Sequence, residues 1–475
     1  MIKCFRFDII RLLINILRSL GGSIMKKTIL TFILILLLLF STATCAHQHQ
    51  WGEWVTVKDY SCSTSGLKER VCECGEKESE VIAPAHDYKD GICIVCNVKK
   101  GSDGLEFALN LEETSYTVKL GTATDEHIVI PSMYNSLPVD TIDDFGFNTT
   151  INSIDIPDSI RIIKNYAFYK CENLKSVVIP DSVVEIGEDA FANCYNLEQV
   201  ILPKNITEIP TRMFMGCDSL RDVVIPNSVT SIGYSAFSSC TSLRSIVIPD
   251  SVESIAEFAF SHCYYLTRVT LGEKLEKIGV GAFGACYKLV EIVNLSPIYL
   301  VAGSMSNGQV SNYALNIYTS LEDDFQQYVD EKGFMFCKSE NQLYLIGYLG
   351  SDSHIELPTT QESYIIRTQA FEEDERLISV IISDSVTKIE SFVFYNCNNL
   401  IHVTISDSVT YMSVDIFGEC DNLKEVIFLD YNNWGWSKYH YDTKGTPISP
   451  DTLKKSDEAA ILLRITHHNH YWIKN

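Results

Sequence analysis

The sequence is poor in basic residues: its 475 residues include 38 lysines and arginines against 61 aspartates and glutamates, a formal net charge of −23. Proteins that bind nucleic acid meet the phosphate backbone with a surplus of lysine and arginine. This balance therefore excludes nucleic acid as a partner and predicts a solvated, acidic surface. Apolar residues make up 46% of the chain, which excludes disorder over its whole length.

Several motifs of common catalytic centres are missing as well. The sequence has no Gly-x-Ser-x-Gly motif, no His-Glu-x-x-His motif and no phosphate-binding loop. Carboxylates are plentiful but occupy variable positions, such as Glu188, Asp189 and Asp222, as expected of a solvated face. The cluster 467–470 contains three histidines that could bind a metal ion, but a polar chain end is the simpler interpretation. We therefore expect no enzymatic activity.

Long hydrophobic runs are also missing, apart from a short one near the start. The run from Ile29 to Phe40 is too short to span a bilayer of about 30 Å comfortably. It follows Met25-Lys26-Lys27 and precedes small residues, and this order is typical of a secretory signal. We assign the signal to residues 25–44 of a leader that covers residues 1–45. Residues 1–24 either precede the true start of translation or form an N-terminal extension.

Cys45, at the end of this leader, has two interpretations. Thr42-Ala43-Thr44-Cys45 approximates the box of a lipoprotein signal, whose cysteine is acylated, although both residues that flank Ala43 depart from the usual ones. The alternative is cleavage nearby and release. Either way we expect an extracellular or cell-surface bacterial protein. If Cys45 is acylated, its lipid is the only contact with the membrane that we expect.

A 23-residue repeat dominates the rest of the chain, with the unit Leu-x-x-Val-x-Ile-Pro-x-Ser-Val-x-x-Ile-Gly-x-x-Ala-Phe-x-x-Cys. A unit this short cannot bury its own apolar face, so the repeat predicts a solenoid of stacked copies. Its phenylalanines are Phe168, Phe191, Phe214, Phe237, Phe260 and Phe283, and they resume at Phe371, Phe394 and Phe417. Its cysteines are Cys171, Cys194, Cys217, Cys240, Cys263, Cys286, Cys397 and Cys420.

Each copy should add one strand, such as Ser176–Ile179, to a parallel β-ladder, while the short Ala-Phe-x-x-Cys stretch should form a helical turn or a 3₁₀ piece. We therefore predict a mainly β fold with short helical turns, an α/β solenoid of 23-residue repeats preceded by a small Cys-rich β module. The residues expected to point inward are Val177, Ile179, Val183, Ile186, Phe191, Cys194 and Leu197.

Between the two inward positions of each strand lies a residue that should face outward. A contiguous exposed apolar stripe often marks an interaction surface, so these positions form our candidate ligand-binding face. The alternative is that β-branched residues simply favour strands. The outward residues are Val178, Ile201, Val224, Val247, Thr270 and Val293, flanked by Ser176, Gln199, Asp222, Ser245 and Arg268.

The repeat closely resembles the BspA-type leucine-rich repeat family of bacterial surface proteins, over about residues 115–428. The resemblance implies an extracellular protein, because members of the family are linked to adhesion and to the binding of host matrix or partner cells.

The cysteines fall into two groups. In a parallel ladder the repeat cysteines would stand side by side, about one strand spacing apart, which suits neither a disulfide nor a tetrahedral zinc site. We expect them to be small buried core residues. At the front, Cys72, Cys74, Cys93 and Cys96 have nearly the spacing of a zinc ribbon, which predicts one structural zinc ion. Disulfides, which export permits, and free thiols are the alternatives.

The rest of the chain divides by composition and period. Residues 46–100 resemble the small Trp/Cys/His modules found ahead of such repeats in related exported proteins. The segment from Gln342 to Gly350 alternates like a strand, and Leu453–Ile465 is helix-like. The expected parts are a zinc-ribbon-like module (46–100), a first array (101–294), an aromatic connector or cap (295–358), a second array (359–430) and an aromatic-rich C-terminal cap (431–475).

Three functions are compatible with this sequence. The first is a surface-exposed module, monomeric, that binds an extracellular protein or glycan through its repeat sheet. The second is a structural or assembly protein of the cell envelope. The third, much less favoured, is a metal-dependent exported enzyme, which would need an open metal site that the sequence does not contain.

Overall fold

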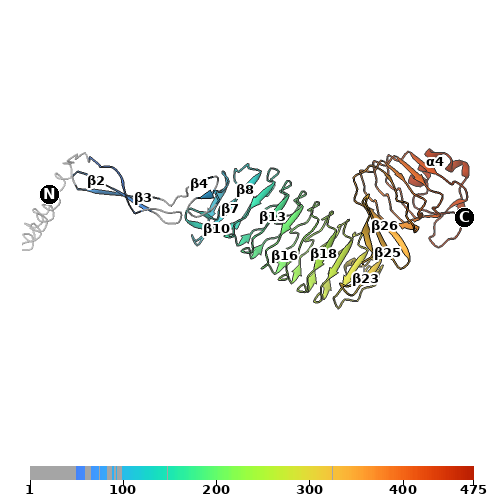
Figure 1. Ribbon diagram of the computed structural model, residues 1–475, viewed down its shortest axis with the longest axis horizontal. Helices are drawn as coiled ribbons and strands as arrows, with labels where there is room; N and C mark the ends of the chain where they lie inside the picture. The colour runs from blue at the N-terminus through green and yellow to red at the C-terminus, as the bar shows by residue number, and fades with distance from the viewer. Residues whose placement is uncertain are drawn as a thin grey trace, which may run out of the picture. The chain divides into compact units, whose positions relative to one another are not determined.

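The computed structural model describes residues 50–58, 66–73, 75–82, 88–89, 92–93, 99–146, 148–323 and 325–474. It divides into two compact units, residues 1–85 and 86–475 (Figure 1). None of the helices within the described ranges is long and apolar enough to cross a membrane.

The first unit contains a three-stranded antiparallel sheet of β1 (Val55–Lys58), β2 (Gly66–Val71) and β3 (Lys77–Ile82). Its contacts are largely polar. Lys68 pairs with Glu80 at 3.0 Å, Arg70 pairs with Glu78 at 2.5 Å, and the Arg70 guanidinium lies 4.7 Å from the centre of the Trp54 ring. Cross-strand ion pairs and cation–π contacts therefore hold this sheet together.

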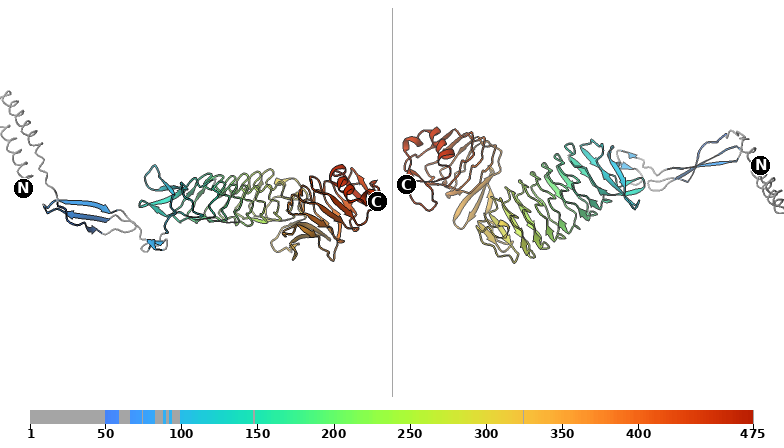
Figure 2. Two further views of the ribbon diagram at one scale, coloured as in Figure 1. Left: turned by 90° about the horizontal axis from the view of Figure 1, so that it is seen from above. Right: turned by 180° about the vertical axis from the view of Figure 1, so that it is seen from behind.

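The second unit begins with the short hairpin β4 (Tyr88–Lys89) and β5 (Ile92–Cys93) and continues as a β-solenoid. Figure 2 shows its turns stacked in succession. The turns form two parallel ladders, where the sequence predicted one. Ladder A of the first array contains β8 (His127–Val129), β11 (Ser153–Asp155), β13 (Ser176–Val178), β15 (Gln199–Ile201), β18 (Ser245–Ile248), β20 (Arg268–Leu271), β22 (Glu291–Asn294) and β23 (Asn316–Tyr318).

Ladder B runs along a second side of the same turns and consists mostly of two-residue strands. Strands this short do not show the alternation of apolar and polar residues that predicts a strand from sequence. At its start β6 and β9 pair antiparallel with their neighbours. Its members are β6 (Glu106–Leu109), β7 (Tyr116–Lys119), β9 (Met133–Tyr134), β10 (Leu137–Ile142), β12 (Ile162–Ile163), β14 (Glu185–Ile186), β16 (Glu208–Ile209), β17 (Ser231–Ile232), β19 (Ser254–Ile255) and β21 (Lys277–Ile278).

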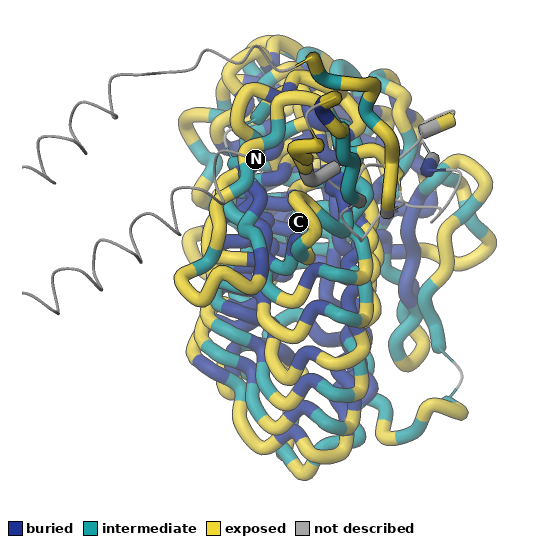
Figure 3. The backbone as a smooth tube through the Cα atoms, turned by 90° about the vertical axis from the view of Figure 1, so that its left-hand side faces the viewer, coloured by how far each residue is buried: buried dark blue, intermediate teal, exposed yellow. Residues whose placement is uncertain are grey.

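The register of ladder A explains the core. Val177 pairs with Val200, and Ile246 pairs with Val269, so equivalent residues of successive turns lie side by side. All seven residues expected to point inward are buried, which confirms that prediction, and Figure 3 shows the buried positions on the inside of the coil. The repeat phenylalanines stack along the axis of each array with centroid separations between 5.0 and 5.8 Å.

The third side of each turn is the Ala-Phe-x-x-Cys stretch, which forms successive turns with hydrogen bonds between residues three apart, such as the Ala192 amide to the Asp189 carbonyl at 3.1 Å and the Cys194 amide to the Phe191 carbonyl at 3.3 Å. In one copy, Asp189 and Asn193 adopt left-handed φ values of 55° and 59°, and such residues interrupt a right-handed helix. The Phe191 amide donates to the Met213 carbonyl of the next turn at 3.0 Å. The backbone amides of one copy thus donate to the carbonyls of the next copy, and these hydrogen bonds link the stacked turns.

The second array has the same two ladders and its own core. Gln342–Tyr348 forms a strand, as predicted, and pairs with the preceding strand as a hairpin. Ladder A contains β27 (His354–Glu356), β29 (Ser379–Ile381), β31 (His402–Ile405) and β33 (Glu425–Phe428). Ladder B contains β24 (Gln327–Val329), β25 (Phe334–Ser339), β26 (Gln342–Tyr348), β28 (Tyr364–Ile366), β30 (Val386–Ile389) and β32 (Tyr411–Met412).

The C-terminal segment extends ladder B with three antiparallel strands, so the edge of β32 pairs with β36. The helix-like stretch is indeed helical in part. Its elements are β34 (Trp434–Ser437), β35 (Thr446–Pro447), α3 (Pro450–Leu453), α4 (Ser456–Ile461), the π-helical turn η2 (Leu462–Thr466) and β36 (Tyr471–Lys474); a short 3₁₀ turn, η1 (Asn307–Gln309), lies in the connector.

Candidate functional site

The outward positions of ladder A form an exposed apolar row of four residues in the first array. The exposed fractions are 57% for Val178, 60% for Ile201, 82% for Val224 and 59% for Val247. Each stands between two buried neighbours in the sequence, so its side chain points to the opposite side of the backbone, toward solvent. We call these four residues the apolar row.

Two rows of polar residues run beside the apolar row, two and three positions before it in each turn. The inner one contains Gln199 and Asp222, which the sequence placed in the site, together with Ser176 and Ser245, and all four are exposed. The outer one, Lys175, Glu198, Arg221 and Arg244, is also exposed and was not part of the predicted site. Three of its four members are basic, which is unusual for a chain of net charge −23.

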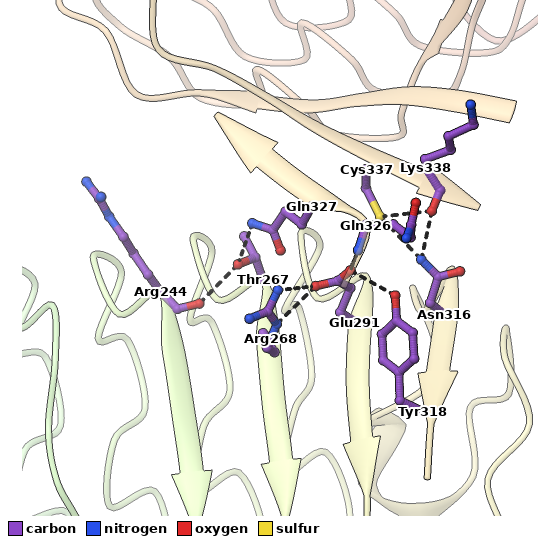
Figure 4. A network of polar contacts seen from close by, with 10 residues as sticks. All are labelled: Arg244, Thr267, Arg268, Glu291, Asn316, Tyr318, Gln326, Gln327, Cys337 and Lys338. Carbon is purple, nitrogen blue, oxygen red and sulfur yellow. Dashed lines mark hydrogen bonds and ion pairs between the residues drawn. The ribbon is translucent and has the colours of Figure 1, made fainter. Parts of the chain in front are cut away.

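Thr270 does not belong to the exposed site, which corrects the prediction. It is 8% exposed and Val293 is fully buried, although both continue the register of Val247. The connector covers this end of the sheet. The Phe325 ring lies 4.1 Å from the Arg268 guanidinium. Gln327 Nε2 donates to Thr267 Oγ1 at 2.9 Å (Figure 4). Arg268 is therefore half-buried and supports the connector.

The connector is held by a buried carboxylate. Glu291 is fully buried and accepts hydrogen bonds from Arg268 Nη2 at 2.6 Å, from Tyr318 Oη at 3.1 Å and from the Gln326 amide at 2.9 Å (Figure 4). Burial, together with the neighbouring Glu291 charge, raises the pKa of Tyr318. The only sequence signal for this contact was the interruption of the 23-residue period.

Ladder A is interrupted at the centre of the apolar row. Of the residues Asp222–Ile225, all of them described, only Asp222 pairs in the sheet, through an isolated bridge to Gln199, and neighbouring copies form regular strands. Val224, in this gap, is the most exposed member of the row. The second array has a weaker equivalent, because Glu356 and the half-buried Thr404 alternate there with Ile381 and Ile427.

The repeat thiols are buried core residues, as predicted, and each also makes a hydrogen bond. The Cys217 thiol donates to the Phe191 carbonyl of the previous turn at 3.2 Å, and the Cys397 thiol donates to the Phe371 carbonyl at 3.1 Å. All eight repeat cysteines donate this hydrogen bond to the carbonyl of the residue 26 positions earlier in the sequence. Burial raises the pKa of the Cys171 thiol to about 12, so this thiol is a poor nucleophile and metal ligand.

The proposed zinc ligands and the lipidation site fall largely outside the described residues, as Cys45, Cys74 and Cys96 all do. Cys72 and Cys93 are buried, and the Cys72 backbone forms a bridge with Trp51. The structural zinc ion and the lipid on Cys45 therefore stay predictions.

The C-terminal histidines do not converge on one point. His467 and His470 contact the Trp436 ring with centroid distances of 4.7 and 4.6 Å, whereas His468 pairs with Asp415. Burial lowers the pKa of both His467 and His470. Within the described ranges no group of three or more His, Cys, Asp or Glu side chains could hold a metal ion.

A glycine pattern of the dinucleotide-binding type, Gly-x-Gly-x-x-Gly, spans residues 279–284 after the short strand β21. A dinucleotide site needs a helix that begins at these glycines. Here the glycines lie in the turn side of an ordinary repeat, and Phe283 is buried in the phenylalanine stack. The pattern is thus part of the repeat.

Comparison with known proteins places these features in a family. Residues 140–255, 207–314 and 349–438, more than half of the chain, match the BspA type leucine rich repeat region. A search of curated proteins gives no match. Similar solved structures include a leucine rich cell surface protein from Faecalibacterium prausnitzii, which is 24% identical over 69% of this chain and 94% of its own, with a TM-score of 0.37.

The leucine rich repeat protein of T. pallidum is 31% identical over 41% of this chain and 81% of its own, with a TM-score of 0.33. A leucine-rich repeat protein from Bacteroides ovatus is 20% identical over 68% of this chain and 93% of its own, with a TM-score of 0.34. With its two-ladder coil, its buried thiols and these matched residues, the chain belongs to the BspA-type leucine-rich repeat family.

Proposed function

We propose that this protein is an exported, surface-exposed binding module whose first array recognises a partner protein through the apolar row. The observation that carries the proposal is the contiguous exposure of four β-branched side chains, between 57% and 82%, on adjacent turns. A contiguous exposed apolar row of this kind suits the core of an interface.

The energetics indicate how the flanking rows would contribute. Burying the exposed part of one Val or Ile side chain is worth about 1 to 1.5 kcal/mol, so the row supplies about 4 to 6 kcal/mol. A micromolar complex needs about 8 kcal/mol after the costs of association. Arg221 and Arg244 lie beside the row and are exposed, and arginine is a frequent hot-spot residue. The partner should therefore present carboxylates beside an apolar centre.

The signal-like segment 25–44 supports export to the bacterial surface, where lipid on Cys45 would anchor the protein. The BspA-type family also supports a surface location and a role in binding, and no catalytic role is proposed. A structural zinc ion at the front cysteines belongs to the same proposal; metal analysis of the purified protein tests it, and less than half an equivalent of zinc would contradict it.

The experiment for the apolar row uses the purified full chain as bait for proteins from host matrix, mucin and cell-envelope extracts. The test variant is Val224→Arg with Val247→Arg. The matched control is Val184→Arg with Val280→Arg, since these valines are 57% and 70% exposed but lie outside ladder A. The proposal expects wild type and control to capture the same protein and the test variant to lose it at least tenfold. Equal capture by all three would remove the row from consideration, and self-association without extract would favour the assembly role.

A further inference from the structure

A second candidate site lies in the second array, on the turn side and away from ladder A. A cavity of about 400 Å³ opens where the turns that contain Phe392–Tyr395 and Asp415–Asp421 meet η2 and His468 of the C-terminal segment. This volume is within the range of small-molecule sites. None of the apolar row contributes to its lining.

One wall of the cavity is aromatic, and a glycine shapes it. The Tyr395 and Phe392 rings meet edge to face with a centroid distance of 5.5 Å. Gly418 lies in the next turn at the position that Tyr395 occupies, and a Cβ atom there would come within 2.9 Å of Tyr395 Cδ2. The absence of a side chain at Gly418 therefore lets the Tyr395 ring lie close to the backbone of the next turn.

The rest of the lining carries both hydrogen-bond acceptors and donors. Asp415 is hydrogen-bonded to His468. Arg464 Nη1 donates to the Asp421 carbonyl at 2.5 Å and lies 3.9 Å from its carboxylate. The Arg464 side chain is 23% exposed and that of Asp421 is 82% exposed. Glu419 adds a third carboxylate, so a ligand would meet three acidic groups and two cationic or proton-donating ones.

This mixture limits the chemistry of the ligand. An anion such as phosphate would face three carboxylates, and an organic cation would face the Arg464 guanidinium. A neutral compound rich in hydroxyl groups satisfies both kinds of group, because a hydroxyl both donates and accepts hydrogen bonds. Its C–H face would also cover the Tyr395 ring. We infer that this cavity binds a neutral sugar residue of a glycan.

The inference goes beyond the proposed protein-binding row, because it uses a different array and a different side of the coil. It gives the protein a second specificity, for a carbohydrate, that does not depend on Val224 or Val247. The two sites can therefore fail independently, and the variants named for each distinguish them.

The experiment is saturation-transfer NMR on the full chain with a panel of small probes. The neutral sugars are galactose, glucose, fucose, N-acetylglucosamine and N-acetylgalactosamine. Glucosamine is the cationic probe and inorganic phosphate is the anionic probe. The inference expects at least one neutral sugar to bind and neither ion to bind. Tyr395→Ala should weaken that binding at least tenfold. Tyr169→Ala, the same repeat position in the first array, is the matched control and should leave it unchanged.

A second variant guards against loss of folding. Asp421→Asn changes a side chain that is 82% exposed, so it cannot disturb the core, and it should weaken sugar binding by at least threefold. The inference is overturned if no neutral sugar binds at 10 mM, if only glucosamine or phosphate binds, or if Tyr395→Ala and Asp421→Asn both bind as wild type does.

Discussion

Raising the pH from 7 to 10 should destabilise the first array through its buried thiols. Burial raises the pKa of the Cys171 thiol to about 12 and raises that of Cys217 still further, whereas a cysteine in an unfolded chain has a pKa of about 8.5. The folded state therefore keeps these thiols protonated while the unfolded state ionises. The stabilisation that each thiol provides is complete below about pH 8.5 and is lost as the pH rises toward the folded-state pKa.

The contribution of one buried thiol to the free energy of unfolding can be measured with Cys217→Ala. At pH 7 the variant should be less stable than wild type by about 1 to 2 kcal/mol, because it loses a small buried group and a weak hydrogen bond to the Phe191 carbonyl. At pH 10 the wild-type thiol costs about 2 kcal/mol, since 1.5 pH units above 8.5 correspond to about 1.4 kcal/mol each. The variant escapes that cost, so the difference in stability should nearly vanish.

The assay is urea unfolding in reducing buffer at both pH values, followed by far-ultraviolet circular dichroism. Val184→Ala is the control, because it removes an exposed, non-ionisable side chain and its effect should not depend on the pH. A stability difference for Cys217→Ala that is the same at pH 7 and pH 10 would refute the buried-thiol account. So would a loss above about 3 kcal/mol at pH 7, which would indicate a bond to metal or sulfur.

Three further predictions concern other parts of the fold. Phe237→Ala removes two ring stacks of 5.4 and 5.1 Å and should cost about 3 to 5 kcal/mol in urea unfolding. Glu291→Ala leaves Arg268 unpaired and should cost about 3 kcal/mol, with faster hydrogen exchange at Thr270 as its local sign. Burial lowers the pKa of His467 and His470. The stability that these neutral rings provide to the C-terminal segment should therefore be complete above about pH 6.5 and fall as the pH drops below it. Urea unfolding at pH 7.5 and pH 5 checks this, and His470→Phe should reduce the difference in stability between the two pH values.

Most of the solenoid could be predicted because the sequence pattern that specifies each turn is short and recurs in every copy. The 23-residue step fixes which side chains of a copy lie beside their equivalents in the next, so Val177, Cys194 and the outward Val178 followed from spacing alone. The prediction that the repeat thiols are buried core residues followed from the same parallel geometry. The hydrogen bond from each thiol to a carbonyl of the previous turn did not, since spacing does not give the direction of a side-chain donor.

The parts that could not be predicted depend on contacts outside the repeat. Thr270 obeys the same pattern as Val247, yet the connector covers it, and nothing in the repeat itself shows where Phe325 will lie. The sugar-site candidate likewise joins Tyr395 to Arg464 across different elements. Ladder B was missed because strands of two residues, such as Glu185–Ile186, are too short to show alternation.

The central claim is that the apolar row is the surface by which this protein binds its partner. The most direct test is hydrogen–deuterium exchange of the full chain with and without a protein captured from the extracts. The account predicts slower exchange in residues 175–179, 198–202, 221–225 and 244–248, with no change around Val184. Protection confined to the turn side or to the second array, with exchange in these four segments unaltered, would contradict it.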